Sequence, residues 1–336
     1  MCENRGVVRR GFILGSAVIA ALPGTARAEE SAEDSRARWL AGMPSGTPAT
    51  ADWQVYAASE DDRWQRSIEA RVKPMHDFGA REIQPLLPAD HAVVYPFAGP
   101  DALHVLSLFG AARRYLLVGL EPVGKLVDPR AVPPGYFARL GAATSDVHRL
   151  SFFRTQEMAS DFERDGVIAA LLATIARMNG KVSSVQTAAT TVRVEWTVAG
   201  AARRLDYIQS DLSNGGLQSN GQLSASLQAL APHVTFVKAA MFLLAEARFS
   251  TLRKMLLQGS SLLLQDDTGI PLRHLDASWS TRLFGRYEAP GAPFEERFQP
   301  DLRAAYERRA ATPLAFGIGY HVEAKRSNLL LASRVR

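Results

Sequence analysis

Two adjacent carboxylates follow an apolar segment in the second half of the chain. Asp266 and Asp267 lie in the sequence QDDTGIP, which continues from residues 261–265, a segment we predict as a buried strand. Adjacent carboxylates can hold one raised pKa for acid–base catalysis, and together with Asp211, at the end of another predicted strand, they could bind a hard cation. These residue types also favour a simple turn, and this alternative stays open. Because neighbouring residues of a strand point to opposite faces, we expect at most one of the two aspartates to face a given ligand.

A second pair of residues is suited to proton transfer. Asp101 and His104 lie three residues apart in a predicted helix over residues 101–109, so they share one helical face. The spacing allows an acid–base pair or two metal ligands, and we take Asp101, His104 and Asp266 as the candidate catalytic residues. The rest of this helix is apolar, so a buried histidine that only stabilises the fold is the competing interpretation.

The first predicted strand ends in the sequence YPFAGPD, a turn that in Rossmann-like folds holds an anionic or nucleoside ligand over a helix N-terminus. Tyr95 and Gly99 are therefore candidate ligand-binding residues. Gly99 is the only glycine of this turn and Pro100 removes an N–H donor, so we do not expect a pyrophosphate site. Glu121 follows Gly99 by 22 residues, close to the spacing of about 20 at which an acid meets a ribose hydroxyl. The simpler alternatives are that Asp101 caps its helix and that Glu121 precedes a proline turn.

No other catalytic signature is present in the sequence. It lacks the HExxH, GxSxG and phosphate-binding P-loop patterns, and Cys2 is its single cysteine. Whether the protein is an enzyme, and which cofactor or metal it binds, if any, stay open.

The elements that would position these residues alternate between strands and helices. We predict strands over 91–99, 114–120, 185–199, 203–211, 233–237, 261–265, 314–320 and 328–332. We predict helices that begin near 59 and over 101–109, 134–150, 165–178, 241–257 and 300–309. Strands joined by helices favour an α/β fold with a mostly parallel sheet, helices on both faces and a C-terminal antiparallel hairpin.

Over about residues 90–336 this order of elements resembles the class I methyltransferase variant of the Rossmann-like fold. The strings YPFAGPD, GLEPVG, QDDTGIP, GIGYH and SNLLLA also resemble an uncharacterised family of exported bacterial proteins. The first resemblance implies a fold, and neither implies a reaction.

The first 28 residues have the three parts of an export signal. Arg9 and Arg10 precede a short apolar run, and a small-residue site ends at Ala28. We predict transport by the twin-arginine translocase, cleavage by signal peptidase after Ala28, and a periplasmic or secreted protein. The general secretion route is the alternative. The apolar run is too short for a membrane-spanning helix, so we expect no stable membrane anchor.

Removal of the signal changes the composition of the chain. The formal charge falls from +5 to +2 because four arginines and one glutamate are lost, and Cys2 is lost with them. We therefore expect no nucleic-acid partner, disulfide or thiol chemistry in the mature protein. We divide the chain into a signal over 1–28, a flexible linker over 29–58 and a single α/β domain over 59–336.

The sequence leads to two hypotheses of function. The first is an exported soluble protein that binds a small polar ligand at the carboxyl edge of the sheet. The candidate ligand-binding residues are Tyr95, Gly99, Glu121, Asp211 and Asp267. The second is a non-catalytic envelope interaction protein that retains a degenerate methyltransferase-like fold.

Overall fold

The computed structural model describes residues 31–47, 49–150 and 165–335, with only the backbone of residues 149 and 150. These residues belong to one compact unit, Ser31–Arg336. The predicted export signal, including Arg9 and Arg10, lies outside them. Within this described part, no helix is both long and apolar enough to cross a membrane.

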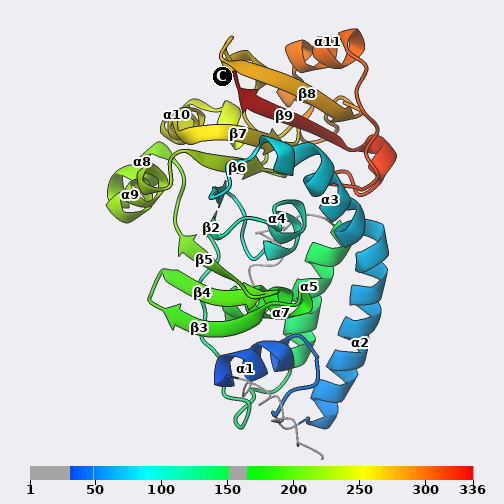
Figure 1. The fold of residues 1–336 in the computed structure, drawn as a ribbon, viewed down its shortest axis with the longest axis vertical. Coiled ribbons are helices and arrows are strands. Elements are labelled where there is room, and N and C mark those ends of the chain that lie inside the picture. The colour runs from blue at the N-terminus through cyan, green and yellow to red at the C-terminus, as the bar shows by residue number, and fades with distance from the viewer. Residues whose placement is uncertain (1–30, 48, 151–164, 336) are drawn as a thin grey trace, which may run out of the picture. The chain divides into compact units, whose positions relative to one another are not determined.

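A nine-stranded sheet runs through the described residues (Figure 1). Its strands are β1 (Ala92–Tyr95), β2 (Arg114–Gly119), β3 (Lys181–Thr187), β4 (Thr191–Val198), β5 (Ala201–Gln209), β6 (His233–Val237), β7 (Ser260–Gln265), β8 (Trp279–Gly285) and β9 (Asn328–Arg334). Their order is β3-β4-β5-β2-β1-β6-β7-β9-β8. The five central strands from β5 to β7 pair in parallel, whereas β4 and β9 run antiparallel to both of their neighbours. The fold is therefore α/β with a mostly parallel central sheet.

Helices lie on both faces of this sheet. They are α1 (Ala32–Leu40), α2 (Ala51–Ser67), α3 (Lys73–Phe78), α4 (Ala102–Leu108), α5 (Tyr136–Leu150), α7 (Ile168–Arg177), α8 (Asn214–Ser219), α9 (Gly221–Ala229), α10 (Ser250–Gly259) and α11 (Pro300–Arg308). Strand β1 separates two apolar cores: Val93 and Tyr95 pack in one core with α4 and α7, and Val94 packs in the other with α9 and α10. Burial on both faces explains why the central strands are apolar at successive positions.

One nearly continuous helical run covers residues 51–86. It consists of α2, the π-helical segment η1 (Ile68–Val72), α3, a second π-helical segment η2 (Gly79–Ile83) and a short 3-10 turn η3 (Gln84–Leu86). Pro74 and Pro85 lack an N–H, and each proline ring would collide with the carbonyl four residues earlier in a regular α-helix. Those carbonyls belong to Ala70 in η1 and Arg81 in η2. The prolines thus account for the two π-helical segments.

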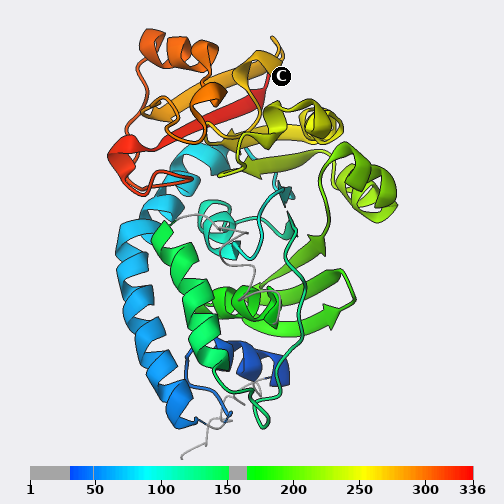
Figure 2. The same ribbon diagram turned by 180° about the vertical axis from the view of Figure 1, so that it is seen from behind.

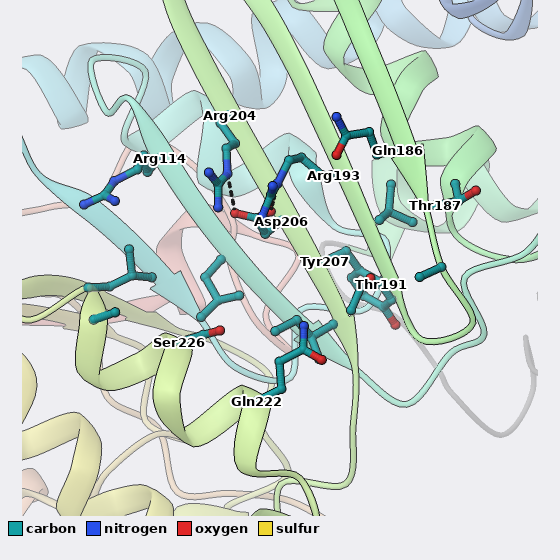
Figure 3. A pocket seen from close by; sticks show the side chains of 16 residues that line it. Arg114, Gln186, Thr187, Thr191, Arg193, Arg204, Asp206, Tyr207, Gln222 and Ser226 are labelled. Atoms are coloured by element: carbon teal, nitrogen blue, oxygen red, sulfur yellow. Dashed lines mark hydrogen bonds and ion pairs between the residues drawn. The ribbon is translucent and has the colours of Figure 1, made fainter.

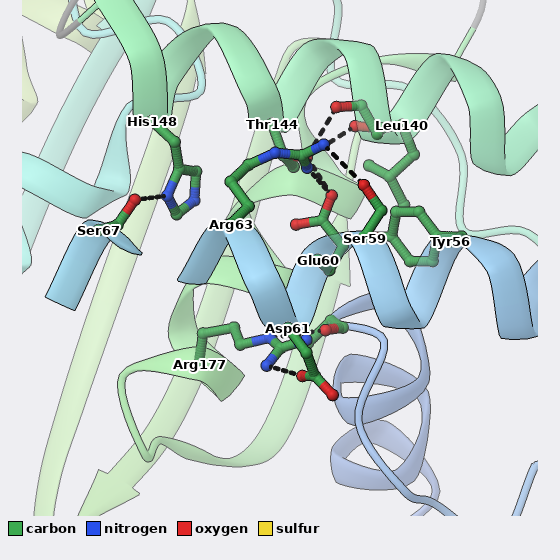
Figure 4. Close-up of polar contacts among 12 residues, drawn as sticks. Tyr56, Ser59, Glu60, Asp61, Arg63, Ser67, Leu140, Thr144, His148 and Arg177 are labelled. Atoms are coloured by element: carbon green, nitrogen blue, oxygen red, sulfur yellow. Dashed lines mark hydrogen bonds and ion pairs between the residues drawn. The ribbon is translucent and has the colours of Figure 1, made fainter. Parts of the chain in front are cut away.

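A buried carboxylate holds α2 against α5, which lie side by side in Figures 1 and 2. The Thr144 hydroxyl on α5 lies 2.9 Å from Glu60 Oε1 on α2, and Arg63 donates to the same hydroxyl over 3.1 Å and also pairs with Glu60 (Figure 4). Burial raises the pKa of Glu60, while Arg63 and Thr144 lower it. These contacts fix the long helical run along one side of the domain.

The N-terminal part of the described chain differs from the predicted flexible linker over residues 29–58. It contains α1 and the first turns of α2, and Trp39 and Leu40 of α1 are each 1% exposed in the main core. Helix α2 begins well before the predicted start near Ser59, because the Thr50 side chain caps its first turn. Trp39 and Leu40 thus anchor this segment in the core although most of its other residues are small or polar.

The C-terminal antiparallel pair is not the predicted hairpin of residues 314–320 and 328–332. Residues 314–320 lie outside the sheet, and β8, which we did not predict, pairs with β9 instead. A methyl group at Gly317 would collide with the Val322 carbonyl, so the chain turns too tightly there for a strand. The predicted strand 185–199 is likewise two strands, the end of β3 and all of β4, separated by a turn.

We predict that Gly79→Ala destabilises the protein. Gly79 lies in the helical run where an added Cβ would collide with the backbone carbonyl of Leu108 at the end of α4. Separating the two helices should lower the free energy of unfolding by about 2 kcal/mol, measured by urea denaturation. Gly221→Ala is the control, because an added Cβ there meets no heavy atom within 4 Å. Equal stability of the two variants would contradict the prediction.

Candidate functional site

The Asp101 carboxylate is the centre of a buried polar cluster at the carboxyl ends of β1 and β6. Asp101 caps α4 by accepting from the backbone N–H of His104 over 3.2 Å. Its Oδ1 lies 2.7 Å from His104 Nδ1, and its Oδ2 accepts from the Tyr95 hydroxyl over 2.9 Å. Lys238, directly after β6, places its Nζ 2.7 Å from the same Oδ2. One carboxylate thus joins the end of β1, the start of α4 and the end of β6.

The charges of this cluster are unequal. Burial raises the pKa of Asp101, but His104 and Lys238 lower it more, so this carboxyl titrates well below its usual range. The pKa of His104 is lowered to about 4, chiefly by burial and also by the positive charges of Lys238 and Arg71, against the raising effect of Asp101. At neutral pH the imidazole is therefore neutral and donates its Nδ1–H to the ionised Asp101.

The cluster is closed to solvent. Asp101 is 1%, His104 0% and Lys238 2% exposed. A ligand reaches these side chains only if the surrounding elements move. Tyr95 and His104 both hydrogen-bond to Asp101, as their nearby positions in the sequence suggest, and these bonds connect the end of β1 to the start of α4. Their predicted roles in catalysis and ligand binding stay predictions.

Glu121 lies directly beside Gly99, as the spacing along the chain suggests. Gly99 has φ +52°, and a Cβ built on it would lie 3.2 Å from Glu121 Oε2. A Cβ on Gly119, at the end of β2, would collide with the same carboxylate oxygen. The Tyr207 hydroxyl donates to the Glu121 carbonyl over 2.7 Å. The two glycines thus leave room for the carboxylate between the ends of β1 and β2.

Strained backbone collects at the same edge of the sheet. Phe97 after β1 has φ +60°, and Ala239, Met241 and Phe242 after β6 have φ +48°, +50° and +57°. Non-glycine residues in this region cost free energy, and such residues cluster at ligand sites and switch regions. The turn that carries Lys238 is therefore held in an unfavourable conformation by its surroundings.

Asp266 provides part of that support. Its Oδ2 accepts from the backbone N–H of Ala239 over 2.8 Å, and Thr268, bonded to its Oδ1, accepts from the N–H of Ala240 over 2.8 Å. Burial raises the pKa of Asp266, while these hydrogen bonds and Lys238 lower it. Asp266 thus braces the turn after β6 and lies near the Asp101 cluster.

Asp267 lies next to Asp266 in the sequence, but its side chain lies beside Asn328 of β9. Gln299, which precedes α11, donates its Nε2–H to the Asp267 carbonyl over 2.6 Å. Burial and the charge of Asp266 raise the pKa of Asp267 to about 7, against the lowering effect of Asn328.

Asp211 lies apart from the two buried aspartates. Its carboxylate accepts from the N–H and hydroxyl of Ser213 over 2.8 and 2.7 Å, which places it in the turn before α8. The described residues contain no group of three or more His, Cys, Asp or Glu side chains suited to a metal ion. The cation site envisaged from Asp211, Asp266 and Asp267 is therefore not formed in this part of the chain.

Two charged residues of the cluster were missed from the sequence. Lys238 is the lone charge in the apolar run HVTFVKAAMFLL, and a charge directly after a buried strand is the signal that could have identified it. Arg71 lies in η1, is 6% exposed, and is close enough to Asp101 for that carboxylate to raise its pKa against the larger lowering effect of burial. Nothing in the local sequence distinguishes Arg71 from the solvent-exposed arginines of the same helical run.

Comparison with known proteins adds no family assignment. No protein-family model matches the sequence, and no curated protein matches it. A solved structure titled "Native and K252c bound RebC-10x" shares 13% identity at a TM-score of 0.13 and covers 74% of this chain. The chain spans 46% of that structure. A similarity at this level carries no argument about fold or function.

We predict that Lys238→Met raises the pKa of His104. The substitution removes a positive charge that disfavours the imidazolium while keeping the length of the side chain. Histidine NMR titration measures the shift, and Lys254→Met, at an exposed position of α10, should leave it unchanged. Because Asp101 loses its ion-pair partner, the variant should also unfold more easily, by about 3 kcal/mol. An unaltered His104 titration in the folded variant would contradict the geometry.

We predict that Asp267→Asn stabilises the protein at neutral pH. The pKa of Asp267 is raised on folding, so between about pH 4 and pH 7 the unfolded chain releases this proton first and stability falls as pH rises. Asparagine carries no proton to lose, so the variant should gain up to about 4 kcal/mol at pH 7 and nothing near pH 3, measured by urea denaturation. Asp90→Asn, on the exposed chain before β1, is the control. A gain that is independent of pH would refute this assignment.

Proposed function

We propose that the chain has a Rossmann-like fold of the class I methyltransferase type and binds a small nucleoside-like ligand at the carboxyl edge of its sheet. The order of the parallel strands is the observation that carries the proposal. From β1 the chain adds β2 and β5 on one side, then crosses to add β6 and β7 on the other. In open α/β sheets ligands bind where the strand order reverses in this way. The antiparallel β9 also agrees with the resemblance to the methyltransferase variant.

Glu121 is the polar group that suits such a ligand. It follows β2 beside Gly99 and is 6% exposed, so a ligand reaches it only by entering between the ends of β1 and β2. There the carboxylate can accept hydrogen bonds from two neighbouring ribose hydroxyls. Leu120 and Met241, which follow β2 and β6, are 59% and 51% exposed. Large apolar side chains this exposed can contact the flat face of a base. In this arrangement Glu121 binds the ribose hydroxyls, and Leu120 and Met241 contact the base.

The burial of the polar cluster favours binding without catalysis. Asp101 and His104 are the acid–base candidates closest to the reversal point, and both are almost completely buried. Pro100 removes a donor from the turn that would hold phosphate groups. The second candidate, a non-catalytic envelope interaction protein with a degenerate methyltransferase-like fold, rests on these observations. For either function we propose export by the twin-arginine route, on the sequence of residues 1–28 alone.

We predict that Glu121→Gln weakens nucleoside binding at least about tenfold, because an amide loses one of the two acceptors offered to the ribose hydroxyls. Isothermal titration calorimetry of the protein with S-adenosylmethionine, S-adenosylhomocysteine and adenosine measures the effect. Glu69→Gln removes the same charge from an exposed site on the helical run and should leave affinity unchanged. Failure of all three nucleosides to bind the unsubstituted protein would exclude the first candidate and leave the second.

A further inference from the structure

A cavity lies on the face of the sheet between α9 and strands β2, β4 and β5 (Figure 3). Its volume is about 380 Å³, within the range of small-molecule sites. None of the residues of the Asp101 cluster, nor Glu121, Asp266 or Asp267, lines it. Any function of this cavity is therefore separate from the carboxyl edge.

Two arginines in the cavity are held by one carboxylate. Asp206 on β5 lies directly across from Arg193 on β4 and two residues beyond Arg204 on its own strand. Arg193 donates its Nε–H to Asp206 Oδ1 and Arg204 donates its Nε–H to Oδ2, each over 2.7 Å (Figure 3). The carboxylate thus fixes both guanidinium groups on the same face of the sheet.

The shared carboxylate leaves an excess of positive charge. Arg114 on β2 lies directly across from Arg204 and also lines the cavity, so three arginines face one aspartate. Glu195 pairs with Arg204 in the sheet register, but it does not line the cavity and lies beyond 4 Å of any cation in the described chain. Each Nε is used in holding Asp206, whereas the terminal nitrogens of Arg193 and Arg204 are the donors best placed to bind an oxyanion in a forked arrangement.

The rest of the lining suits a polyhydroxylated molecule. Neutral polar side chains come from both walls, Gln222 and Ser226 from α9 and Gln186 and Thr191 from the hairpin of β3 and β4 (Figure 3). These groups both donate and accept hydrogen bonds, as sugar hydroxyls require. Beneath them Leu116 is buried in the core and closes the floor.

We propose that this cavity is a binding site for a small sugar that carries an oxyanion, either a phosphate or a carboxylate. The forked donors of Arg193 and Arg204 bind the oxyanion, and the side chains from α9 and the hairpin bind the hydroxyls. Asp206 is a positioning residue that fixes the two arginines before the ligand arrives. The site does not depend on the function proposed for the carboxyl edge.

Calorimetric titration with glucose 6-phosphate, glucuronate, glucose and inorganic phosphate tests the proposal. We expect at least one of the two sugar anions to bind, more tightly than both glucose and inorganic phosphate, and more weakly as salt concentration rises. Preference between the two anions identifies the oxyanion. Arg193→Gln and Arg204→Gln should each weaken binding at least about tenfold. No binding of either sugar anion below about 10 mM, or equal binding of inorganic phosphate, would overturn the proposal.

Two further variants separate this site from a general effect of charge or stability. Arg113→Gln removes the same charge from the residue next to Arg114, outside the cavity lining, and should leave affinity unchanged. Ser226→Phe changes no charge but fills the cavity from α9, and it should abolish binding. Circular dichroism establishes that each variant is folded. Equal losses for Arg113→Gln and Arg193→Gln, or undiminished binding by Ser226→Phe, would place the ligand elsewhere.

Discussion

The ion pair between Asp101 and Lys238 is the interaction on which the centre of the sheet depends. It lies where the strand order reverses, and it joins the ends of β1 and β6, which are neighbours in the sheet although they are far apart in the sequence. Burying both charges is costly, so the pair persists only because Tyr95 and His104 satisfy the remaining positions on the carboxylate. The strained turn after β6 and its support by Asp266 follow from the need to hold Lys238 in place.

The charged side chains that join the central strands are different from those that line the cavity. The groups with the strongest charge interactions are inside, and Glu121 is also buried, at 6% exposure, whereas Arg114, Arg193 and Arg204 line a cavity on one face of the sheet. Strongly perturbed pKa values are a common guide to active sites, but here they belong mainly to groups that hold the fold together.

The sequence predicted the parallel centre of the sheet better than its margins. Apolar runs such as HVTFV predict strands well, because strands covered on both faces need no polar positions. The strand β8, WSTRLFG, mixes polar and apolar residues at the edge of the sheet and escaped notice. Spacing along the chain placed Gly99 beside Glu121 and Asp101 beside His104. The partners Lys238 and Arg71 come from distant segments, and only the tertiary fold brings them there.

The contact between α1 and β3 shows how the open edge of the sheet is protected. Ser31 donates to the carbonyl of Val182 over 2.7 Å, and Asp34 accepts from the Val182 N–H over 2.8 Å, so the first described helix occupies backbone groups that an edge strand would otherwise present. Exposed edges of this kind allow chains to pair with one another. The start of α1 therefore covers part of this edge, and removal of the residues up to Asp34 would leave the N–H and carbonyl of Val182 free to pair with another strand.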